Sequence, residues 1–404
     1  MTRDPLSLAE VAVPLSAHAR MAVARPGLLW GRDVQRILCV RLDNLGDVLM
    51  TTPALRALRN TCPDRHLTLL TSPAGAAVAP FLADVDEVIR YDAPWAGARP
   101  PRSHPADFAM QQRLQEGEFD AAVIFTVYSQ NPMPAATMCY LAGIHRRLAR
   151  CRENPYALLS DWVRETEPEH GVQHEVRRQL SLVQAIGADA VDTRMRMQLR
   201  SIDRRTLDSI LARRGIDADT PYAVIHPGAS AESRRYPVEQ FAQAAARLVR
   251  ATGMNVLVTG SKSEAPLAHA LIHAAGPCVR PFMHDLTDAF ELGAFAALIE
   301  RATVVISNNS GPVHIASALG APVVDLYALT NPQHGPWQTP HRVLFNDVEC
   351  RWCYRSVCPE IHHRCLRGIS AADVADAALA LIDETGAAPV SAPPADHSIA
   401  TPTE

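Results

Sequence analysis

The chain has 404 residues, 48% of them hydrophobic, and a formal net charge of −4. This length is sufficient for two domains, and the sequence contains no run of about 18 apolar residues that could span a bilayer. The small net charge gives no electrostatic reason to expect a nucleic acid as partner. Together these features predict a soluble globular protein.

The two ends of the chain differ in composition from the rest. The first 32 residues are rich in alanine and proline and lack the apolar core of a secretory signal. We therefore interpret residues 1–32 as an N-terminal extension and expect a cytoplasmic protein, in which reducing conditions disfavour disulfides. Residues 385–404 show no apolar periodicity, and we predict a disordered tail.

The segment Arg36–Leu55 changes its hydrophobic period without an insertion. Ile37–Val40 is a short apolar run, typical of a strand buried on both faces, whereas from Asp47 apolar residues recur every three or four positions, as in a helix. The polar loop between them contains Asp43 and Gly46. A strand, a tight loop and a helix start form half of a βαβ unit, in which free backbone N–H groups bind ligands.

The rest of the first half continues as strands and helices. The expected strands are His66–Thr71, Val85–Tyr91 and Phe119–Thr126, and the expected helices are Gln111–Glu116, Ala135–Ala142 and His174–Ile186. Two loops contain several prolines: Ala93–Ala109 is expected to be irregular, and Tyr128–Pro134 suits a substrate loop. We interpret the basic cluster His145–Arg152 as a solvated helix face.

A second alternating series starts at Tyr222, after a charged segment, Asp189–Arg205, that we interpret as a linker. Its expected strands are Tyr222–Ile225, Asn255–Val258, Thr303–Ile306 and Pro322–Leu326, and its expected helices are Val238–Arg250, Glu264–Ala274, Phe290–Arg301, Pro312–Leu319 and Ile369–Ile382. Ser370 and Asp373 provide a capping-box-like start for the last helix. Strands alternating with helices predict a parallel sheet in each half, hence two α/β domains at residues 33–205 and 206–384.

The segment Ser307–His314 is a candidate anion-binding site. A buried strand runs into Asn309 and Ser310, and Pro312 suits the first helical position. With the helix dipole, free N–H groups there could hold a phosphate or diphosphate. The N–H groups we expect to be available are those of Gly311, Val313 and His314. The alternative interpretation is a well-capped helix that binds nothing.

The loop His226–Pro237 occupies the equivalent position after its own strand. Ser230 and Ser233 offer hydroxyl groups, and Arg234 and Arg235 supply fixed positive charge. Because arginine forks match phosphate oxygens, either arginine could neutralise the charge that develops on a leaving diphosphate. The alternative is an arginine pair on the surface.

Asp47 has two interpretations. An acid at a helix N-terminus is stabilised by the helix dipole, which lowers its pKa and is a sufficient structural reason for its presence. A carboxylate of low pKa can also accept a proton from a hydroxyl group that becomes acidic as it attacks, which is the role of a general base. Only the geometry of the site distinguishes the two.

Four cysteines crowd into the segment CRWCYRSVCPEIHHRC. They are Cys350, Cys353, Cys358 and Cys365, with His362 and His363 as further candidate ligands. Four thiolates that begin with a C-x2-C spacing suit a structural zinc or iron site, whose closed shell leaves no position for catalysis. Because the second pair lacks this spacing, free or redox-active thiols are the alternative.

Three motifs together resemble glycosyltransferase family 9, the ADP-heptose:lipopolysaccharide heptosyltransferases. They are RLDNLGDVLMTTPAL at Arg41–Leu55, HPGAS with RRYP within His226–Pro237, and SNNSGPVHIASALGAPVV at Ser307–Val324. The resemblance covers about Val34–Asp383 and implies a GT-B fold, in which two Rossmann-like domains face a cleft. It also implies that the acceptor binds the N-terminal domain and the nucleotide sugar the C-terminal one, with inversion at the anomeric carbon and no catalytic metal.

The resemblance implies roles for individual residues. Asp47 would be the general base, and Arg234, which stands where the family usually has a lysine, would hold the diphosphate. Asn309 stands where the family motif D-S-G-P-x-H has an aspartate. The asparagine keeps the hydrogen-bonding shape but lacks the charge, and this difference bears on sugar specificity. The other residues implied on the donor side are Gly46, Ser230, Thr259, Gly260, Ser261, Asp285, Thr287, Ser310, Gly311, Val313 and His314. Some relatives hold iron in a cysteine-rich segment.

The sequence therefore predicts an inverting glycosyltransferase. We expect it to transfer a sugar, namely heptose from ADP-heptose, to a hydroxyl group of a glycan or glycolipid, without a catalytic cofactor and with peripheral contact to the inner membrane. Two alternatives remain: a nucleotide-sugar epimerase of the same fold, which would need acids or a base near the sugar in the C-terminal half, and a non-catalytic nucleotide-sugar-binding protein.

Overall fold

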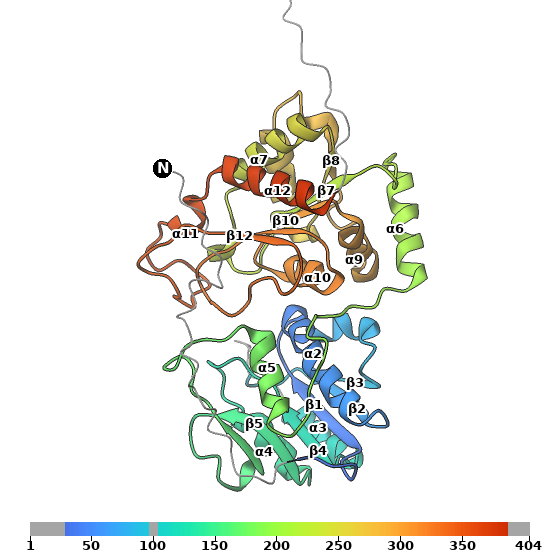
Figure 1. The fold of residues 1–404 in the computed structure, drawn as a ribbon, viewed down its shortest axis with the longest axis vertical. Helices are drawn as coiled ribbons and strands as arrows, with labels where there is room; N and C mark the ends of the chain where they lie inside the picture. Colours follow the sequence, from blue (N-terminus) through green and yellow to red (C-terminus); the bar gives the residue numbers. More distant parts are fainter. Residues whose placement is uncertain (1–28, 97–103, 387–404) are drawn as a thin grey trace, which may run out of the picture. The chain divides into compact units, whose positions relative to one another are not determined.

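The computed structural model describes residues 29–96 and 104–386, which fall into two units (Figure 1). The described part of the first unit runs to residue 204 and also includes 310–320 and 331–339, and the second unit comprises 205–309, 321–330 and 340–386. The expected extension at 1–32, loop at 93–109 and tail at 385–404 lie largely or partly outside the described residues. None of the described helices is both long and apolar enough to cross a membrane.

The first unit is built on a six-stranded sheet of parallel pairs, in the order β3-β2-β1-β4-β5-β6. Its strands are β1 (Arg36–Arg41), β2 (His66–Thr71), β3 (Glu87–Arg90), β4 (Ala121–Ile124), β5 (Arg146–Cys151) and β6 (Asp161–Arg164). The apolar run Ile37–Val40 is buried, as expected for a strand covered on both faces. The strand order reverses at the neighbours β1 and β4, where open α/β sheets bind their ligands.

The helices of the first unit follow the strands in sequence. They are α2 (Leu45–Thr61), η1 (Gly75–Phe81), α3 (Pro105–Glu116), α4 (Met133–Leu141), η2 (Tyr156–Leu158) and α5 (Glu175–Gln184), and α10 (Gly311–Leu319) belongs to the same unit. Helix α2 packs against both α5 and α10. The start of α2 therefore lies beside two other helices of its unit.

The second unit contains another six-stranded parallel sheet, in the order β12-β11-β10-β7-β8-β9. Its strands are β7 (Tyr222–His226), β8 (Asn255–Val258), β9 (Met283–Asp285), β10 (Val304–Asn308), β11 (Val323–Leu326) and β12 (His341–Leu344). Counted from β7, this is the strand order of the first sheet again, with the reversal between β7 and β10. The expectation of two Rossmann-like parallel-sheet domains in an α/β fold is confirmed.

Helix α6 (Ser201–Arg213) leads into the second unit. The remaining helices are η3 (Glu232–Arg234), α7 (Val238–Thr252), η4 (Lys262–Glu264), α8 (Ala265–Ala274), η5 (Arg280–Phe282), α9 (Leu292–Arg301), α11 (Arg364–Arg367) and α12 (Ala371–Thr385). Figure 1 shows α12, in red, beside α7, and the two helices contact each other. The predicted capping box of α12 is present, because Ser370 Oγ accepts from the Asp373 N–H and the Asp373 carboxylate accepts from the Ser370 N–H.

One element was predicted wrongly. The basic segment His145–Arg152 is not a solvated helix face but contains strand β5, of which every residue after the first is buried. Its arginines are tolerated because their guanidinium groups bind polar atoms: Arg147 Nε donates to the Leu158 carbonyl at 2.7 Å, and Arg150 Nη2 donates to Ser181 Oγ at 2.6 Å.

Other differences concern element ends and short strands. Helix α3 begins at Pro105, inside the segment predicted to be irregular, and α6 begins at Ser201, inside the predicted linker. Strands β6, β9 and β12 were not predicted because each has only three or four residues and contains polar positions, so none shows a continuous apolar run.

Candidate active site

The junction of β1 and α2 places Asp47 in the first turn of the helix. Its Oδ2 accepts a hydrogen bond from the Asn44 N–H at 3.2 Å, which completes a capping box. Asp47 therefore does have the structural role of an acid that stabilises a helix N-terminus. The other carboxylate oxygen, Oδ1, does not serve the cap.

Arg41, the last residue of β1, is fully buried and binds three carboxylates. Its Nη2 lies 3.2 Å from Asp47 Oδ1, its Nε 3.0 Å from Asp43 Oδ2, and its Nη1 2.9 Å from Glu175 Oε1. Glu175 is the first residue of α5 and is also fully buried. A single guanidinium thus fixes the positions of three acids, one each from the loop after β1, from α2 and from α5.

The two aspartates have opposite pKa shifts. Burial raises the pKa of Asp47, but Arg41, His334 and His314 outweigh burial, and the pKa stays below its usual value. For Asp43, burial and the neighbouring charges of Asp47 and Glu175 outweigh Arg41, and the pKa is raised. Asp47 is therefore the carboxyl group that remains ionised more readily.

Gly46 and His314 are two predicted site residues that the fold brings together. A Cβ atom added to Gly46 would lie 2.5 Å from Cδ2 of the His314 ring, so only glycine leaves room for this ring. The His334 ring is edge-on to His314, with centroids 6.3 Å apart, and its Nε2 lies 3.8 Å from Asp47 Oδ1. Two imidazoles therefore face the Asp47 side of the loop.

Helix α10 was predicted to offer N–H groups to an anion. Ser310 is its N-cap, and Pro312 is the second helical residue rather than the first as predicted, because the helix begins at Gly311. The Val313 N–H, however, donates to the Ser310 carbonyl at 3.1 Å because the first turn closes tightly, so it is not the free donor that the sequence predicted. The N–H of Gly311, at the first helical position, is the group best placed for a ligand.

In the second unit, polar groups follow β7 and β8. His226 Nδ1 lies 3.1 Å from Thr259 Oγ1, and the Glu264 carboxylate accepts from both the N–H and the hydroxyl of Ser261 at 2.8 Å. Burial lowers the pKa of His226, although Glu264 opposes the shift. This histidine is therefore favoured in its neutral form.

The predicted nucleotide-side residues form one cluster in this unit. The Asp288 N–H donates to the Gly260 carbonyl at 2.9 Å, which joins the loop after β8 to the loop after β9. Asp285 Oδ1 accepts from the N–H and the hydroxyl of Thr287, at 2.9 and 2.7 Å. Thr259, Gly260, Asp285 and Thr287 thus lie at the ends of the adjacent strands β8 and β9.

Asn309, after β10, points its amide into the protein. Its Nδ2 donates to Asp325 Oδ2 at 2.9 Å, and both residues are buried. Burial raises the pKa of Asp325 well above its usual value, although the hydrogen bond from Asn309 opposes the shift. The sequence signalled the loss of charge at Asn309 but not its pairing with a buried acid on the next strand.

The arginine pair of the loop after β7 divides into two environments. Arg235 is exposed, and its Nε donates to the Ala229 carbonyl at 2.9 Å, whereas Arg234 is half-buried and its guanidinium makes no hydrogen bond or ion pair to any residue the structure describes. Ser233 is buried and donates to the Arg355 carbonyl at 2.8 Å, and Ser230 is exposed. Both guanidinium groups thus keep N–H donors for a ligand, and that of Arg234 has no competing contact among the described residues.

The four clustered cysteines do not assemble a metal shell. Over residues 29–96 and 104–386, no group of three or more His, Cys, Asp or Glu side chains is placed to hold a metal ion. Cys350 Sγ lies 3.7 Å from His362 Nε2, which is the spacing of a weak hydrogen bond rather than of a shared ligand site. The residues present here do not fit the predicted zinc or iron site.

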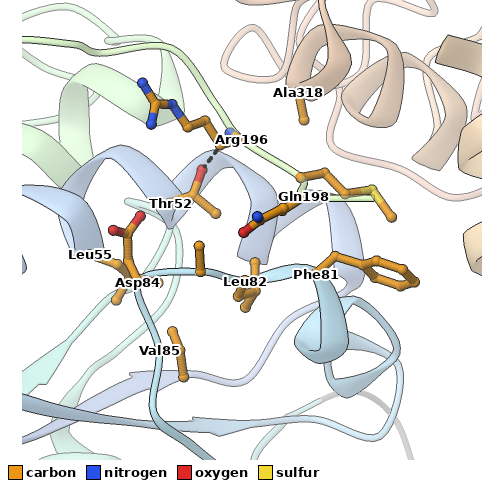
Figure 2. Close-up of a pocket in the computed structure, with 11 residues that line it drawn as sticks. Thr52, Leu55, Phe81, Leu82, Asp84, Val85, Arg196, Gln198 and Ala318 are labelled. Atoms are coloured by element: carbon orange, nitrogen blue, oxygen red, sulfur yellow. Dashed lines mark hydrogen bonds between the residues drawn. The ribbon is translucent and has the colours of Figure 1, made fainter. Parts of the chain in front are cut away.

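A cavity of about 350 Å³ is lined by none of the predicted site residues (Figure 2). Thr52 and Leu55 of α2 line it, together with segments 81–85 and 196–198 and with Ala318 of α10. The dashed line in Figure 2 marks the Arg196 N–H, which donates to Thr52 Oγ1 at 3.2 Å. Since it contains no charged residue of the Arg41 cluster, this cavity is not assigned to the reaction.

Sequence reasoning missed Arg41, Glu175 and His334. Arg41 is the first residue of the motif Arg41–Leu55, and it directly follows the apolar run Ile37–Val40. A charged residue at the end of a buried strand could have indicated a functional role. Glu175 looked like part of the polar face of an amphipathic helix, and His334 lay in a segment without periodicity. Their partners are distant in sequence, so only the fold could reveal them.

The comparisons with known proteins agree with one another. The sequence model of glycosyltransferase family 9 (heptosyltransferase) matches residues 108–363, which is more than half of the chain. Lipooligosaccharide heptosyltransferase 2 of Haemophilus influenzae is 24% identical over 310 residues, covering 74% of this chain and 85% of that protein.

Two solved structures share the fold. The family 9 glycosyltransferase of Veillonella parvula matches with a TM-score of 0.73 and 22% identity, covering 88% of this chain and 99% of that one. The E. coli ADP-heptose lps heptosyltransferase II matches with a TM-score of 0.69 and 20% identity, covering 87% of this chain and 100% of that one.

Proposed function

Since the chain belongs to glycosyltransferase family 9 (heptosyltransferase), we propose that it transfers heptose from ADP-heptose to a hydroxyl group of a lipopolysaccharide-type acceptor. The match to the family model confirms the predicted membership of family 9 and the assignment as a glycosyltransferase. The names of two relatives support this donor: one is an ADP-heptose lps heptosyltransferase and the other a lipooligosaccharide heptosyltransferase. We assign acceptor binding to the first unit and the nucleotide sugar to the second.

The observation that carries this proposal is the carboxylate of Asp47 held by a buried arginine in the motif of this family. Arg41 fixes Asp47 Oδ1 at 3.2 Å, and the low pKa keeps this group ionised. In the proposed step, Asp47 takes the proton of the acceptor hydroxyl group. At the same time, the oxygen of that hydroxyl group forms a bond to the anomeric carbon of the heptose. Because the bond to the diphosphate breaks on the opposite face, the configuration inverts.

The leaving ADP carries the negative charge that develops in this step. We assign its neutralisation to Arg234, whose guanidinium has no other partner among the described residues, and to the start of α10 at Gly311. Fixed positive groups and helix N-termini stabilise such charge because they need not reorganise during the reaction. No catalytic metal takes part in this scheme.

We propose that the protein works at the cytoplasmic face of the inner membrane. A lipooligosaccharide acceptor, as named for the H. influenzae relative, is anchored by its lipid, while a nucleotide sugar is a water-soluble donor. The reaction must therefore take place where the two meet. This assignment depends on the acceptor and fails if the acceptor is not lipid-linked.

The test is an assay of the purified protein with ADP-heptose. Thermal shifts are first measured against ADP-, GDP-, UDP-, CMP- and dTDP-sugars, since a ligand at about 100 times its Kd adds about 2.7 kcal/mol of stability. Mass spectrometry then follows a core oligosaccharide as acceptor. A selective shift with ADP-heptose and a mass gain of one heptose are expected.

Other results would point to the alternatives. Conversion of the nucleotide sugar to an isomer without an acceptor would establish an epimerase. A shift without any turnover would establish a binding protein. A selective shift with a different nucleotide sugar would remove heptose from the proposal but keep glycosyl transfer.

A further inference from the structure

Asp325 is a buried acid of the second unit that the proposed reaction does not use. It lies in β11 (Val323–Leu326) and is fully buried. Its strand neighbours Val324 and Leu326 belong to the apolar core that also contains Val374 and Leu381 of α12. Because successive side chains of a strand point to opposite faces, Asp325 lies on the face of the sheet that is turned away from this core.

The strand register places Asp325 in a polar row across the second sheet. Asp325 is in register with Ser307 of β10, which is in register with His226 of β7, and on its other side Asp325 is in register with Val343 of β12. Residues in register on parallel strands share a face. The two neighbouring strands therefore bring a hydroxyl group and an apolar side chain beside Asp325, but no charge. The Ser307 hydroxyl group donates to the Asn308 carbonyl at 2.8 Å.

The contacts of Asp325 are those of a neutral acid rather than of a carboxylate. Its Oδ2 accepts from Asn309 Nδ2 at 2.9 Å, whereas its Oδ1 is buried without a hydrogen-bond partner, and no ion pair reaches Asp325 from the residues that the structure describes. A buried carboxylate needs a cation or several donors to offset the loss of water. Burial accordingly raises the pKa of Asp325 well above its usual value.

Two hydrogen bonds tie Asn309 to β11. Its backbone N–H donates to the Leu326 carbonyl at 3.1 Å, and its side-chain Nδ2 donates to Asp325. The side-chain amide is thereby fixed in rotation, with its NH2 group towards Asp325 and its carbonyl oxygen away from it. A side-chain carbonyl oxygen has two lone pairs and no charge. Asn309 therefore presents an uncharged acceptor in a set direction.

We propose that Asp325 is a positioning residue for the nucleotide sugar: as an uncharged acid it fixes the amide of Asn309, whose carbonyl oxygen accepts from a hydroxyl group of the donor sugar. The inference rests on the proposed function, which assigns the nucleotide sugar to the second unit. Because Asp325 is fully buried, it acts through Asn309 and not by touching the ligand. The motif of the family has an aspartate where Asn309 stands, so in this chain the acid lies on the next strand and brings no charge to the sugar.

The first test compares ADP-heptose with ADP, which lacks the sugar, by titration calorimetry on the full-length protein. Asp325→Leu removes the acceptor for Asn309 Nδ2, and we expect ADP-heptose to bind about tenfold more weakly while ADP binds as before. Asp325→Asn keeps an uncharged acceptor and should restore ADP-heptose binding to within about twofold of the wild type. Equal weakening of both ligands, no weakening, or failure of Asp325→Asn to restore binding would overturn the inference.

Asn309→Ala shows whether Asp325 acts through Asn309. Asn309→Ala alone should weaken ADP-heptose binding, and adding Asp325→Leu to it should weaken binding no further, because the two residues then form one unit. A further loss in the double variant that equals the loss in Asp325→Leu alone would mean that Asp325 acts by a separate, general structural effect. The comparison of Asn309→Ala with Asn309→Ala/Asp325→Asn gives the same information if the leucine variants do not fold.

The stability of Asp325→Asn tests the charge state without any ligand. In the unfolded chain an aspartate ionises above about pH 3.9, whereas the buried Asp325 keeps its proton to higher pH, so the folded wild type loses stability as the pH rises. Asparagine does not titrate. The Tm of Asp325→Asn relative to the wild type should therefore increase from pH 4 to pH 7.

Asp376→Asn is the matched control, because Asp376 is an exposed acid of α12 in the same unit. Its Tm relative to the wild type should stay nearly constant over the same range. If the relative Tm of Asp325→Asn is also constant, or falls with rising pH, Asp325 is ionised in the folded protein and the inference is wrong.

The two kinds of measurement separate this inference from the proposed function. If the wild type does not bind ADP-heptose, the proposed donor fails, and the part of the inference that concerns the sugar fails with it. If the wild type binds ADP-heptose while Asp325→Leu leaves that affinity unchanged, only the role of Asp325 fails.

Discussion

The strand-end regions of the two units have the same topology but differ in how their ionisable groups are paired. After β1, the buried guanidinium of Arg41 holds three acids at 2.9–3.2 Å. In the second unit, two buried groups are favoured in neutral forms, because burial lowers the pKa of His226 in β7 and raises that of Asp325 in β11, and the pKa of Glu264 is lowered by its hydrogen bonds from Ser261. Proton transfer needs a charge held in place, whereas binding of a nucleotide can rely on dipoles and hydrogen bonds.

The ionic region extends beyond the site. Arg178 of α5 is buried and paired with Glu165 and with Glu167, the latter at 3.3 Å, and its Nε donates to the Thr126 carbonyl at 2.9 Å. Gln333 bridges Glu167 and Glu175, each at 3.4 Å. The first unit therefore depends on buried charges that must all remain paired.

Breaking this network should have the largest effect on stability. Arg178→Met leaves two buried acids without their cation, and we expect a loss of about 3–5 kcal/mol in the free energy of unfolding, measured by urea denaturation. The control is Arg196→Met, which removes an arginine of 59% side-chain exposure paired with Asp192 and should cost at most about 1 kcal/mol. Equal losses in the two variants would show that the buried network is not the source of stability.

Removing a neutral hydrogen-bond site in the second unit should cause a smaller loss in the free energy of unfolding. The Asn308 side chain accepts from the Tyr236 N–H and donates to the Pro227 carbonyl, at 2.9 and 2.8 Å. Asn308→Ala leaves these backbone groups buried without this partner, and we expect a loss of about 1–3 kcal/mol. Because no ionisable group is removed, the loss should be the same at pH 6 and pH 8, and a loss that changes with pH would contradict the neutral character of this hydrogen-bond site.

The effect expected to be smallest near neutral pH is the pH dependence of stability. Burial lowers the pKa of His174 to about 3, although its hydrogen bond to the Gly335 carbonyl opposes the shift. In the unfolded chain this histidine binds a proton near pH 6.5, so the folded state is fully favoured above that pH and loses up to about 1.4 kcal/mol per pH unit on acidification towards pH 3.

His174→Asn is the variant that isolates this effect. Asparagine can still cap α5, where His174 Nδ1 accepts from the Val176 N–H at 3.2 Å, but it does not titrate. Urea denaturation at pH 7, 6 and 5 should give a shallower decline for the variant than for the wild type. Parallel declines would mean that His174 is not the group responsible.

The contrast between the two units also explains how far the sequence could be interpreted. Periodicity was sufficient for the buried strands, such as His66–Thr71, and the motifs located Asp47, Gly46 and the loop at Asn309. These signals are local, since they depend on neighbouring residues and on strand–loop–helix order.

What the sequence could not supply was the pairing of distant charges. The arginines of β5 suggested a solvated surface because their partners, such as Ser181 and the Leu158 carbonyl, lie elsewhere in the chain. In the same way, nothing near Glu175 indicated that it would be buried against Arg41. The cysteine segment shows the converse, because its spacing suggested a metal site that the fold does not assemble.

The most direct test of the account is the turnover of Asp47→Asn with ADP-heptose. Asparagine can still accept at the N-terminus of α2, so a purely structural role would leave turnover nearly intact. If Asp47 is the base, kcat should fall about 10²–10⁴-fold while the thermal shift with ADP-heptose is unchanged. Retained turnover in a folded variant would contradict the assignment of Asp47 as the base.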